Sequence, residues 1–262
     1  MRVVAAGVAL FAAMSSGAPA LAAVSTTGQV VIVHGVRGLV ANVDVDGNRA
    51  LSAFQPERTT DPLTLTAGTH SVVVRRANDP TATPVLTKTV TVPAGGLVSA
   101  AVGLTSEGKP SLTLFSERGA AVPTGKARLV VRHIAAAPTV RVTLDGKAVG
   151  PELSGGPLQV INDLPAGKHA VAVTGADGTP VLAPQDVPLR AGSVTTVYLI
   201  GSASEGTLTW LFRVSDARAL TGVPTGNAGL AATSRSVPWP AAALLLAGVL
   251  LIVPTRRAQR QR

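Results

Sequence analysis

The feature that most constrains this 262-residue chain is an internal repeat at a spacing of 99 residues. Three matches need no gap: Val31-Ile32-Val33-His34 with Val130-Val131-Arg132-His133, Asp46-Gly47 with Asp145-Gly146, and Ala67-Gly68-Thr69-His70 with Ala166-Gly167-Lys168-His169. Self-similarity of this kind indicates two homologous domains, each of about 95 residues and each large enough for a core of its own. We place these domains at residues 28–122 and 126–220, joined by Pro123-Thr124-Gly125.

Each repeat shows short apolar segments separated by turn signals about every ten residues, without a helical period. In the first repeat we expect strands near residues 30–34, 41–46, 63–65, 70–76, 86–92, 98–104 and 112–115. In the second we expect them near residues 129–133, 139–144, 158–161, 169–174, 181–189, 195–200 and 208–214. Asp46-Gly47 and Asp145-Gly146 predict hairpin turns, because Asp-Gly accepts the positive φ that such turns require. The expected fold class is therefore all-β, with two tandem immunoglobulin-like β-sandwich domains.

The same residues resemble a known family. A valine-rich strand, a histidine, a loop and a strand closed by Asp-Gly, followed by an Ala-Gly turn, are similar to a secreted bacterial domain of unknown function that often occurs in tandem. In that family the histidine opens a His-Ala-Ser-Pro-Asp-Ala-Pro loop. Here the loops read His34-Gly35-Val36-Arg37-Gly38 and His133-Ile134-Ala135-Ala136-Ala137-Pro138, so the family's aspartate is missing from both. The resemblance implies the fold and assigns no chemistry.

The N-terminus has the order of a secretory leader. Arg2 precedes an apolar stretch from Val3 to Met14, and small residues follow up to Ala23. The apolar stretch is too short to cross about 30 Å of hydrocarbon, so we expect a cleaved signal peptide at residues 1–23 rather than a membrane span. The chain contains no cysteine, and disulfides therefore cannot stabilise it outside the cell.

The C-terminus predicts a single membrane span. An apolar segment at residues 237–254 precedes a basic tail at residues 255–262 that contains four arginines. Positive charge favours the cytoplasmic side, so the C-terminus is expected in the cytoplasm and both repeats outside, before any processing. Residues 221–236 form a linker in this scheme.

That linker contains a pentapeptide, Leu230-Ala231-Ala232-Thr233-Ser234, which resembles the LAxTG cell-wall sorting signal of high-GC Gram-positive bacteria. The resemblance implies that a class E sortase joins Thr233 to the peptidoglycan precursor. Ser234 stands where the family has glycine. A plain membrane anchor behind a stalk therefore remains the alternative, because the same apolar segment would serve it.

The four histidines suggest transition-metal chemistry, and they occupy two equivalent positions per repeat: His34 with His133 and His70 with His169. Imidazole binds zinc or copper when several ligands converge. Two histidines without cysteine rarely make a tight site, so we favour structural roles and predict neither a metal nor a cofactor. Asp44-Val45-Asp46-Gly47-Asn48 has some features of a calcium loop, but a hairpin turn explains it better.

Charge and motifs exclude further classes. Six of the 23 basic residues lie at Arg2, Arg235 and the four tail arginines, which leaves 17 against 14 acidic residues between them. This dispersed balance predicts no nucleic-acid partner. No G-x-S-x-G, phosphate-binding glycine loop or H-E-x-x-H motif is present.

We therefore expect a non-catalytic, surface-anchored protein that serves envelope structure, adhesion or the binding of an unknown surface ligand. Its expected partners are the cell envelope itself, meaning the membrane and, where the sortase acts, peptidoglycan. The alternatives are an exported enzyme with an unrecognised site and a weak metal-binding module that uses the repeated histidines.

Overall fold

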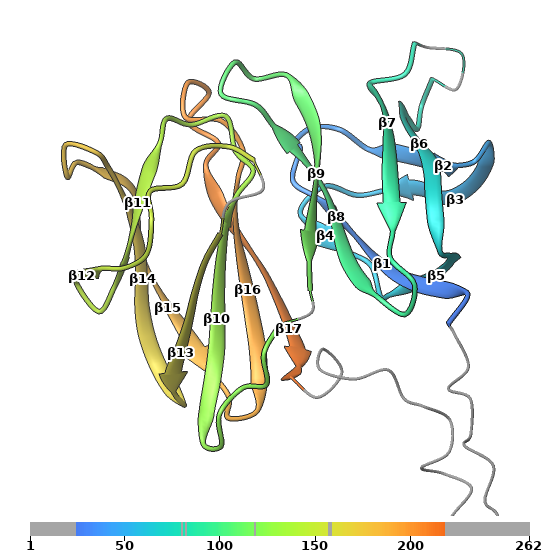
Figure 1. The fold of residues 1–262 in the computed structure, drawn as a ribbon. Coiled ribbons are helices and arrows are strands. Elements are labelled where there is room, and N and C mark those ends of the chain that lie inside the picture. Colours follow the sequence, from blue (N-terminus) through green and yellow to red (C-terminus); the bar gives the residue numbers. More distant parts are fainter. Residues whose placement is uncertain (1–24, 80, 82, 118, 157–158, 218–262) are drawn as a thin grey trace, which may run out of the picture. The chain divides into compact units, whose positions relative to one another are not determined.

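The computed structural model describes residues 25–217 except 80, 82, 118 and 157–158, and these residues belong to one compact unit (Figure 1). All regular elements in this part of the chain are β-strands. Among the described residues there is no helix with the length and hydrophobicity needed to cross a membrane. The predicted signal peptide, linker, membrane helix and basic tail lie outside the described residues.

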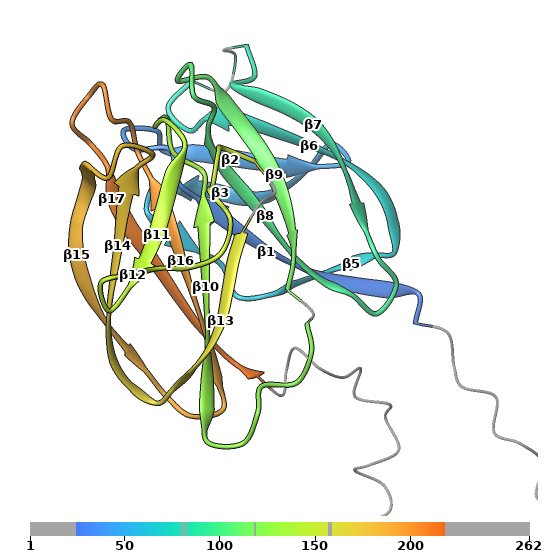
Figure 2. The same cartoon turned by 60° about the vertical axis from the view of Figure 1, so that its left-hand side comes forward.

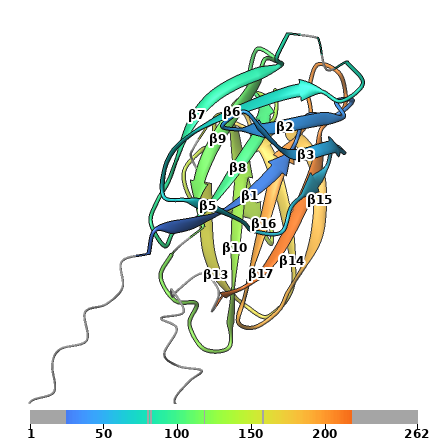
Figure 3. The same ribbon diagram turned by 90° about the vertical axis from the view of Figure 1, so that its right-hand side faces the viewer.

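The first repeat forms two sheets that face each other (Figure 3). The first central sheet has the order β4-β1-β8-β9, with β5 also beside β1. Its strands are β1 (Thr27–His34), β4 (Arg58–Thr59), β5 (Leu63–Thr66), β8 (Leu97–Leu104) and β9 (Pro110–Ser116). The first outer sheet has the order β3-β2-β6-β7. Its strands are β2 (Ala41–Val45), β3 (Asn48–Phe54), β6 (Gly68–Arg76) and β7 (Leu86–Val92).

The second repeat has the same plan (Figure 2). The second central sheet has the order β13-β10-β16-β17, and the second outer sheet has the order β12-β11-β14-β15. The central strands are β10 (Lys126–His133), β13 (Gln159–Pro165), β16 (Ser193–Ile200) and β17 (Thr209–Asp216). The outer strands are β11 (Val140–Leu144), β12 (Lys147–Ala148), β14 (Gly167–Gly175) and β15 (Pro180–Leu189).

Each strand expected from the sequence has a counterpart among these elements. Three further strands, β3, β4 and β12, were not expected. β4 and β12 have two residues each, and β3 is largely exposed, so none of them shows the apolar alternation on which a sequence prediction depends. Both predicted hairpin turns have positive φ angles, with Asp46 at 50° and Gly47 at 79°, and Asp145 at 50° and Gly146 at 78°.

The strand order differs from the immunoglobulin-like arrangement that we expected. In a constant-type immunoglobulin domain the first two strands are neighbours in one sheet. Here β1 and β2 lie in different sheets, and β1 pairs in parallel with β8, as β10 does with β16. The structure confirms the all-β sandwich class. The order of the strands was not predictable, because it depends on long-range pairing that local turn signals do not specify.

The inner strands of the central sheets, β1, β8, β10 and β16, are buried on both faces. Val30 and Ile32 of β1 point into the core of the first sandwich. Val31 and Val33 point the other way, into a third cluster that includes Tyr198 from the second repeat. β8 and β16 are buried along almost their whole length, because each also faces a sandwich core on one side and the third cluster on the other. The two central sheets therefore pack on each other, and the described part of the chain has three cores rather than two.

Candidate functional site

The third core contains one buried charge from β10. Arg132 occupies the position equivalent to Val33 of the first repeat, and Arg132 is only 1% exposed. The guanidinium carbon lies 4.4 Å from the ring centre of Phe115 and 5.5 Å from that of Tyr198. A guanidinium group is weakly hydrated and stacks on aromatic rings, which makes arginine better suited than lysine to such a place.

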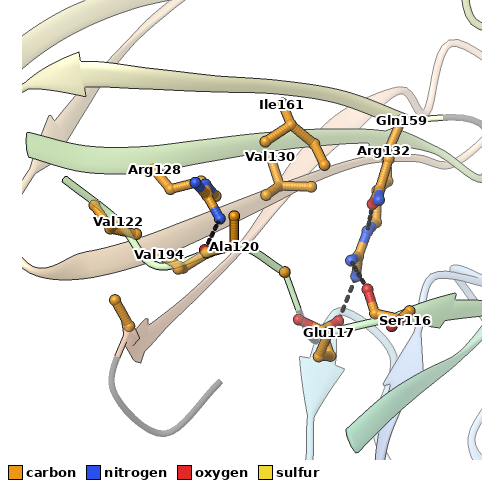
Figure 4. A pocket seen from close by; sticks show the side chains of 12 residues that line it. Ser116, Glu117, Ala120, Val122, Arg128, Val130, Arg132, Gln159, Ile161 and Val194 are labelled. Carbon is orange, nitrogen blue, oxygen red and sulfur yellow. Dashed lines mark hydrogen bonds and ion pairs between the residues drawn. The ribbon is translucent and has the colours of Figure 1, made fainter. Parts of the chain in front are cut away.

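Hydrogen bonds from Arg132 connect the two repeats. Its Nη1 donates to Glu117 Oε1 at 2.5 Å and to the Tyr198 hydroxyl at 2.8 Å, and its Nε donates to Gln159 Oε1 at 2.8 Å. Glu117 follows β9 and also accepts a hydrogen bond from Ser99. Figure 4 shows Arg132 reaching Glu117 across the junction. The buried charges are thus paired and hydrogen-bonded, which a buried ion pair requires.

Burial also acts on the tyrosine of this network. It raises the pKa of Tyr198, so the hydroxyl remains neutral and can accept from Arg132 while it donates to Ser99 Oγ at 3.3 Å. The group therefore acts as a hydrogen-bond relay between the repeats. We call Arg132, Glu117, Tyr198, Ser99 and Gln159 the junction network.

A small cavity adjoins the junction network (Figure 4). Its volume is about 40 Å³, whereas small-molecule sites usually measure about 300–1,000 Å³. Arg128 lines the cavity as well, but its Nε and Nη2 each donate to Asp163 at 2.7 Å, and its Nη1 donates to the Ala120 carbonyl at 2.5 Å. Both guanidinium groups are already engaged, and the space holds no more than a few waters. The geometry fits a joint better than a ligand site.

His34 and His133 hold loops, as the structural interpretation predicted. His34 Nε2 donates to the Leu39 carbonyl at 2.8 Å, and Nδ1 accepts from the Val36 amide at 3.4 Å. His133 makes the equivalent contacts with Pro138 and Ala135 at 3.2 and 3.3 Å. Burial lowers the pKa of both imidazoles, in keeping with a neutral ring whose lone pair is engaged.

His70 and His169 pair with the aspartates of the hairpin turns. His70 Nδ1 lies 2.6 Å from Asp46 Oδ2, and Nε2 lies 2.8 Å from the Thr66 carbonyl. Asp46 Oδ1 accepts from the Ser71 amide at 2.8 Å. Since both nitrogens face acceptors, both must carry hydrogen, and the hydrogen bond with Asp46 raises the pKa of His70 and lowers that of Asp46.

The second repeat repeats this pair. His169 lies 2.8 Å from Asp145 and 3.0 Å from the Pro165 carbonyl. The aspartate raises the pKa of His169 here too. Each histidine thus has its own protein partners, and the described residues contain no group of three or more His, Cys, Asp or Glu side chains placed to hold a metal ion.

Comparison with known proteins identifies the family. A family model described as "Domain of unknown function (DUF4397)" matches residues 28–143 and 134–230. The chain belongs to the DUF4397 family. Two copies of the DUF4397 domain account for the internal repeat. The match confirms the predicted resemblance to a tandem domain of unknown function. The family description assigns no activity.

Other comparisons add little to the DUF4397 assignment. A solved structure matches with a TM-score of 0.23 and 11% identity, covering 73% of this chain and 99% of the other. It is a family 26 carbohydrate-binding module of Eubacterium rectale Amy13K in complex with maltoheptaose. At this TM-score the likeness carries no argument about ligand or function. No curated protein matches the chain.

Sequence reasoning missed two features of this DUF4397 protein. Arg132 was visible as the arginine that replaces Val33 in the repeated tetrapeptide at residues 31–34 and 130–133. The histidine–aspartate pairs were visible as a constant interval of 24 residues, from Asp46 to His70 and from Asp145 to His169. The sorting-like residues 230–234 lie outside the described residues.

Proposed function

We propose that this DUF4397 protein is a non-catalytic, cell-surface-anchored protein whose two sandwiches act as one rigid module for envelope structure, adhesion or ligand binding. The observation that carries the proposal is the junction network, which buries the Arg132–Glu117 pair between the repeats. A flexible tether between independent domains would expose these charges. A shared core instead keeps both repeats in one orientation, as a spacer or a display platform requires.

A non-catalytic role is supported by how the polar groups are used. Arg132 donates hydrogen bonds to both Glu117 and Tyr198, and the adjoining cavity of about 40 Å³ is too small for a substrate. The imidazoles of His34 and His70 are bonded to backbone and aspartate partners. These contacts favour a structural role over the enzyme and metal-binding alternatives.

Anchoring rests on the sequence. The leader at residues 1–23, the apolar segment at residues 237–254 and the arginines that follow it favour an external position for both repeats. We propose that Thr233 is joined to the wall by a sortase, with a membrane anchor as the alternative.

An epitope experiment tests the location. One tag is inserted at the exposed turn residue Gly108 and another follows Arg262, both in the full chain. We expect antibody to label the Gly108 tag on intact cells and the C-terminal tag only after permeabilisation. Failure to label Gly108 on intact cells would exclude the proposed display role.

Mass spectrometry distinguishes the two anchors. If the wall anchor is correct, the surface form ends at Thr233 and is released only when the wall is digested. If the membrane anchor is correct, detergent extracts the chain whole, and a peptide spanning Thr233-Ser234 is recovered from most surface molecules. Either result leaves the display role intact.

A further inference from the structure

β17 is an edge strand with little to prevent pairing. It forms eight consecutive residue pairs with β16 without a bulge, and among the described strands it has no partner on its other side. Proteins usually protect such an edge with proline, charged side chains (lysine above all), an inward-pointing charge, a bulge or short length, because its free N–H and C=O groups can pair with another chain.

The other edge strands of the described sheets each carry such protection. β4, β12 and β5 have only two to four residues, and β3 pairs irregularly with β2. The remaining four carry lysine or proline: Lys88 in β7, Pro110 in β9, Pro165 in β13 and Pro180, Pro184 and Pro188 in β15. β17 contains neither residue type.

The side chains of β17 also favour pairing. Phe212 and Val214 lie on one face of the strand and are 40% and 57% exposed. The strand contains two charged residues, Arg213 and an exposed Asp216 at its end. Arg213 points to the opposite face, where its side chain is only 10% exposed and lies 3.6 Å from Glu117. A groove of about 440 Å³ runs beside residues 212–215, and residues 59–62 of the first repeat form its other wall.

We propose that β17 is a self-association site, at which two copies of this chain pair their β17 strands antiparallel about a two-fold axis at Phe212. In a continuous sheet, directly opposed residues point to the same face. Side chains alternate along a strand and both strands here have the same numbering, so two opposed residues must both be even-numbered or both be odd-numbered. Centring on Phe212 places the two phenylalanines opposite each other and each Trp210 opposite Val214 of the second copy. Aromatic and β-branched pairs of this kind stabilise antiparallel strands.

The neighbouring register supports this choice. Centring on Arg213 would place the two guanidinium groups opposite each other, and like charges at opposed positions destabilise a sheet. We prefer a second copy of this chain as the partner of β17, because Trp210, Phe212 and Val214 of one copy would lie opposite Val214, Phe212 and Trp210 of the other. A two-fold contact also closes after one partner, which leaves no growing edge.

Cysteine crosslinking in the full-length chain tests the proposal, since the natural protein has no cysteine. We expect Phe212→Cys to form a covalent dimer on mild oxidation of membranes or cells, because opposed Cα atoms lie about 4.5–5.5 Å apart and a disulfide spans that distance. Val214→Cys should not crosslink to itself, because the two copies of residue 214 would be about 14 Å apart along the strands. The Trp210→Cys/Val214→Cys double variant should crosslink.

A matched control separates pairing from general stickiness. Ile161 is 51% exposed and lies on β13, the opposite edge of the same sheet. In the Phe212→Cys background, adding Val214→Lys should reduce the dimer several-fold, and adding Ile161→Lys should not. Protease resistance equal to the parent's shows that each variant is folded.

Two outcomes would overturn the proposal. One is the absence of a Phe212→Cys dimer in folded protein, and the other is equal crosslinking of the Phe212→Cys and Val214→Cys variants. A Phe212→Cys adduct with a mass other than twice that of the chain would point instead to a different polypeptide added at this edge.

Discussion

His70 makes two contacts that only its charged form can satisfy, one with Asp46 and one with the Thr66 carbonyl. A protonated imidazole donates from both nitrogens, whereas a neutral one donates from one. The aspartate is correspondingly held ionised by the imidazole and by the Ser71 amide. The pair ties the β2–β3 turn to β6, and the equivalent pair ties the β11–β12 turn to β14.

The first prediction concerns pH. The raised pKa of His70 stabilises the fold fully below the unfolded value of about 6.5, and this contribution is lost as pH rises through the folded value. The lowered pKa of Asp46 stabilises the fold above about pH 4, and its contribution is lost as pH falls through the folded value. We expect the thermal midpoint to fall by a few degrees between pH 6 and pH 9.

The double variant His70→Gln/His169→Gln is the control for this effect. Glutamine keeps one donor but cannot carry charge, so most of the decline between pH 6 and pH 9 should disappear. Thermal unfolding followed by circular dichroism measures it. An unchanged decline in the double variant would show that other groups cause the pH dependence.

A second residue-scale prediction concerns Arg132. Arg132→Met should destabilise the protein by about 3–5 kcal/mol, because it removes the hydrogen-bonded partner of the buried Glu117 carboxylate and leaves it only the more distant Arg213, at 3.6 Å. The double variant Arg132→Met/Glu117→Leu should recover most of that loss, because it removes both charges. Urea unfolding of residues 24–226 gives the free energies. A double variant as unstable as Arg132→Met would contradict the assignment of the loss to an unpaired charge.

At the scale of elements, the end of β8 meets the segment that follows β10 through their backbones. The Leu104 amide donates to the Ile134 carbonyl at 2.9 Å. A Cβ atom added at Gly103 would lie 2.2 Å from that carbonyl oxygen. Only glycine allows the two backbones to approach this closely.

The third prediction follows from this approach. Gly103→Ala should force β8 away from Ile134 and cost about 1–3 kcal/mol, as overpacking usually does. Gly155→Ala is the matched control, because its nearest neighbour, the Leu104 carbonyl oxygen, would lie 4.0 Å from the new Cβ atom. Chemical denaturation compares the two. Equal stability of both variants would argue against close backbone contact between the repeats.

At the scale of the whole molecule, the third core makes the stability of each repeat depend on the other. Val31, Val33 and Phe115 from the first repeat share a cluster with Tyr198 and Ile200 from the second. Separation of the repeats would expose this apolar surface together with a buried ion pair, and both changes are unfavourable.

The fourth prediction is therefore a single unfolding transition for both repeats. Scanning calorimetry should give equal calorimetric and van't Hoff enthalpies. Arg132→Met should broaden or split the transition, since it weakens the junction without altering the two sandwich cores. Two separate transitions in the wild-type protein would mean that the repeats unfold independently.

The sequence alone determined the strand positions, both Asp-Gly turns and the repeat, as the match of β7 to its expected range of 86–92 illustrates. These features depend on the local pattern of apolar residues and on the φ angles that Asp-Gly accepts. The loop-holding roles of His34 and His133 were also predictable, because each stands at a strand end before a short loop.

The tertiary structure alone decided which faces are buried and which residues meet. β16 carries Thr195, Thr196 and Tyr198 and reads as a half-exposed strand, yet all eight of its residues are buried. Arg132 and Glu117 are in contact although they lie 15 positions apart, on either side of the linker between the repeats. The physical reason is that burial on the second face of a sheet depends on packing against the other repeat, a long-range interaction that local sequence patterns do not specify.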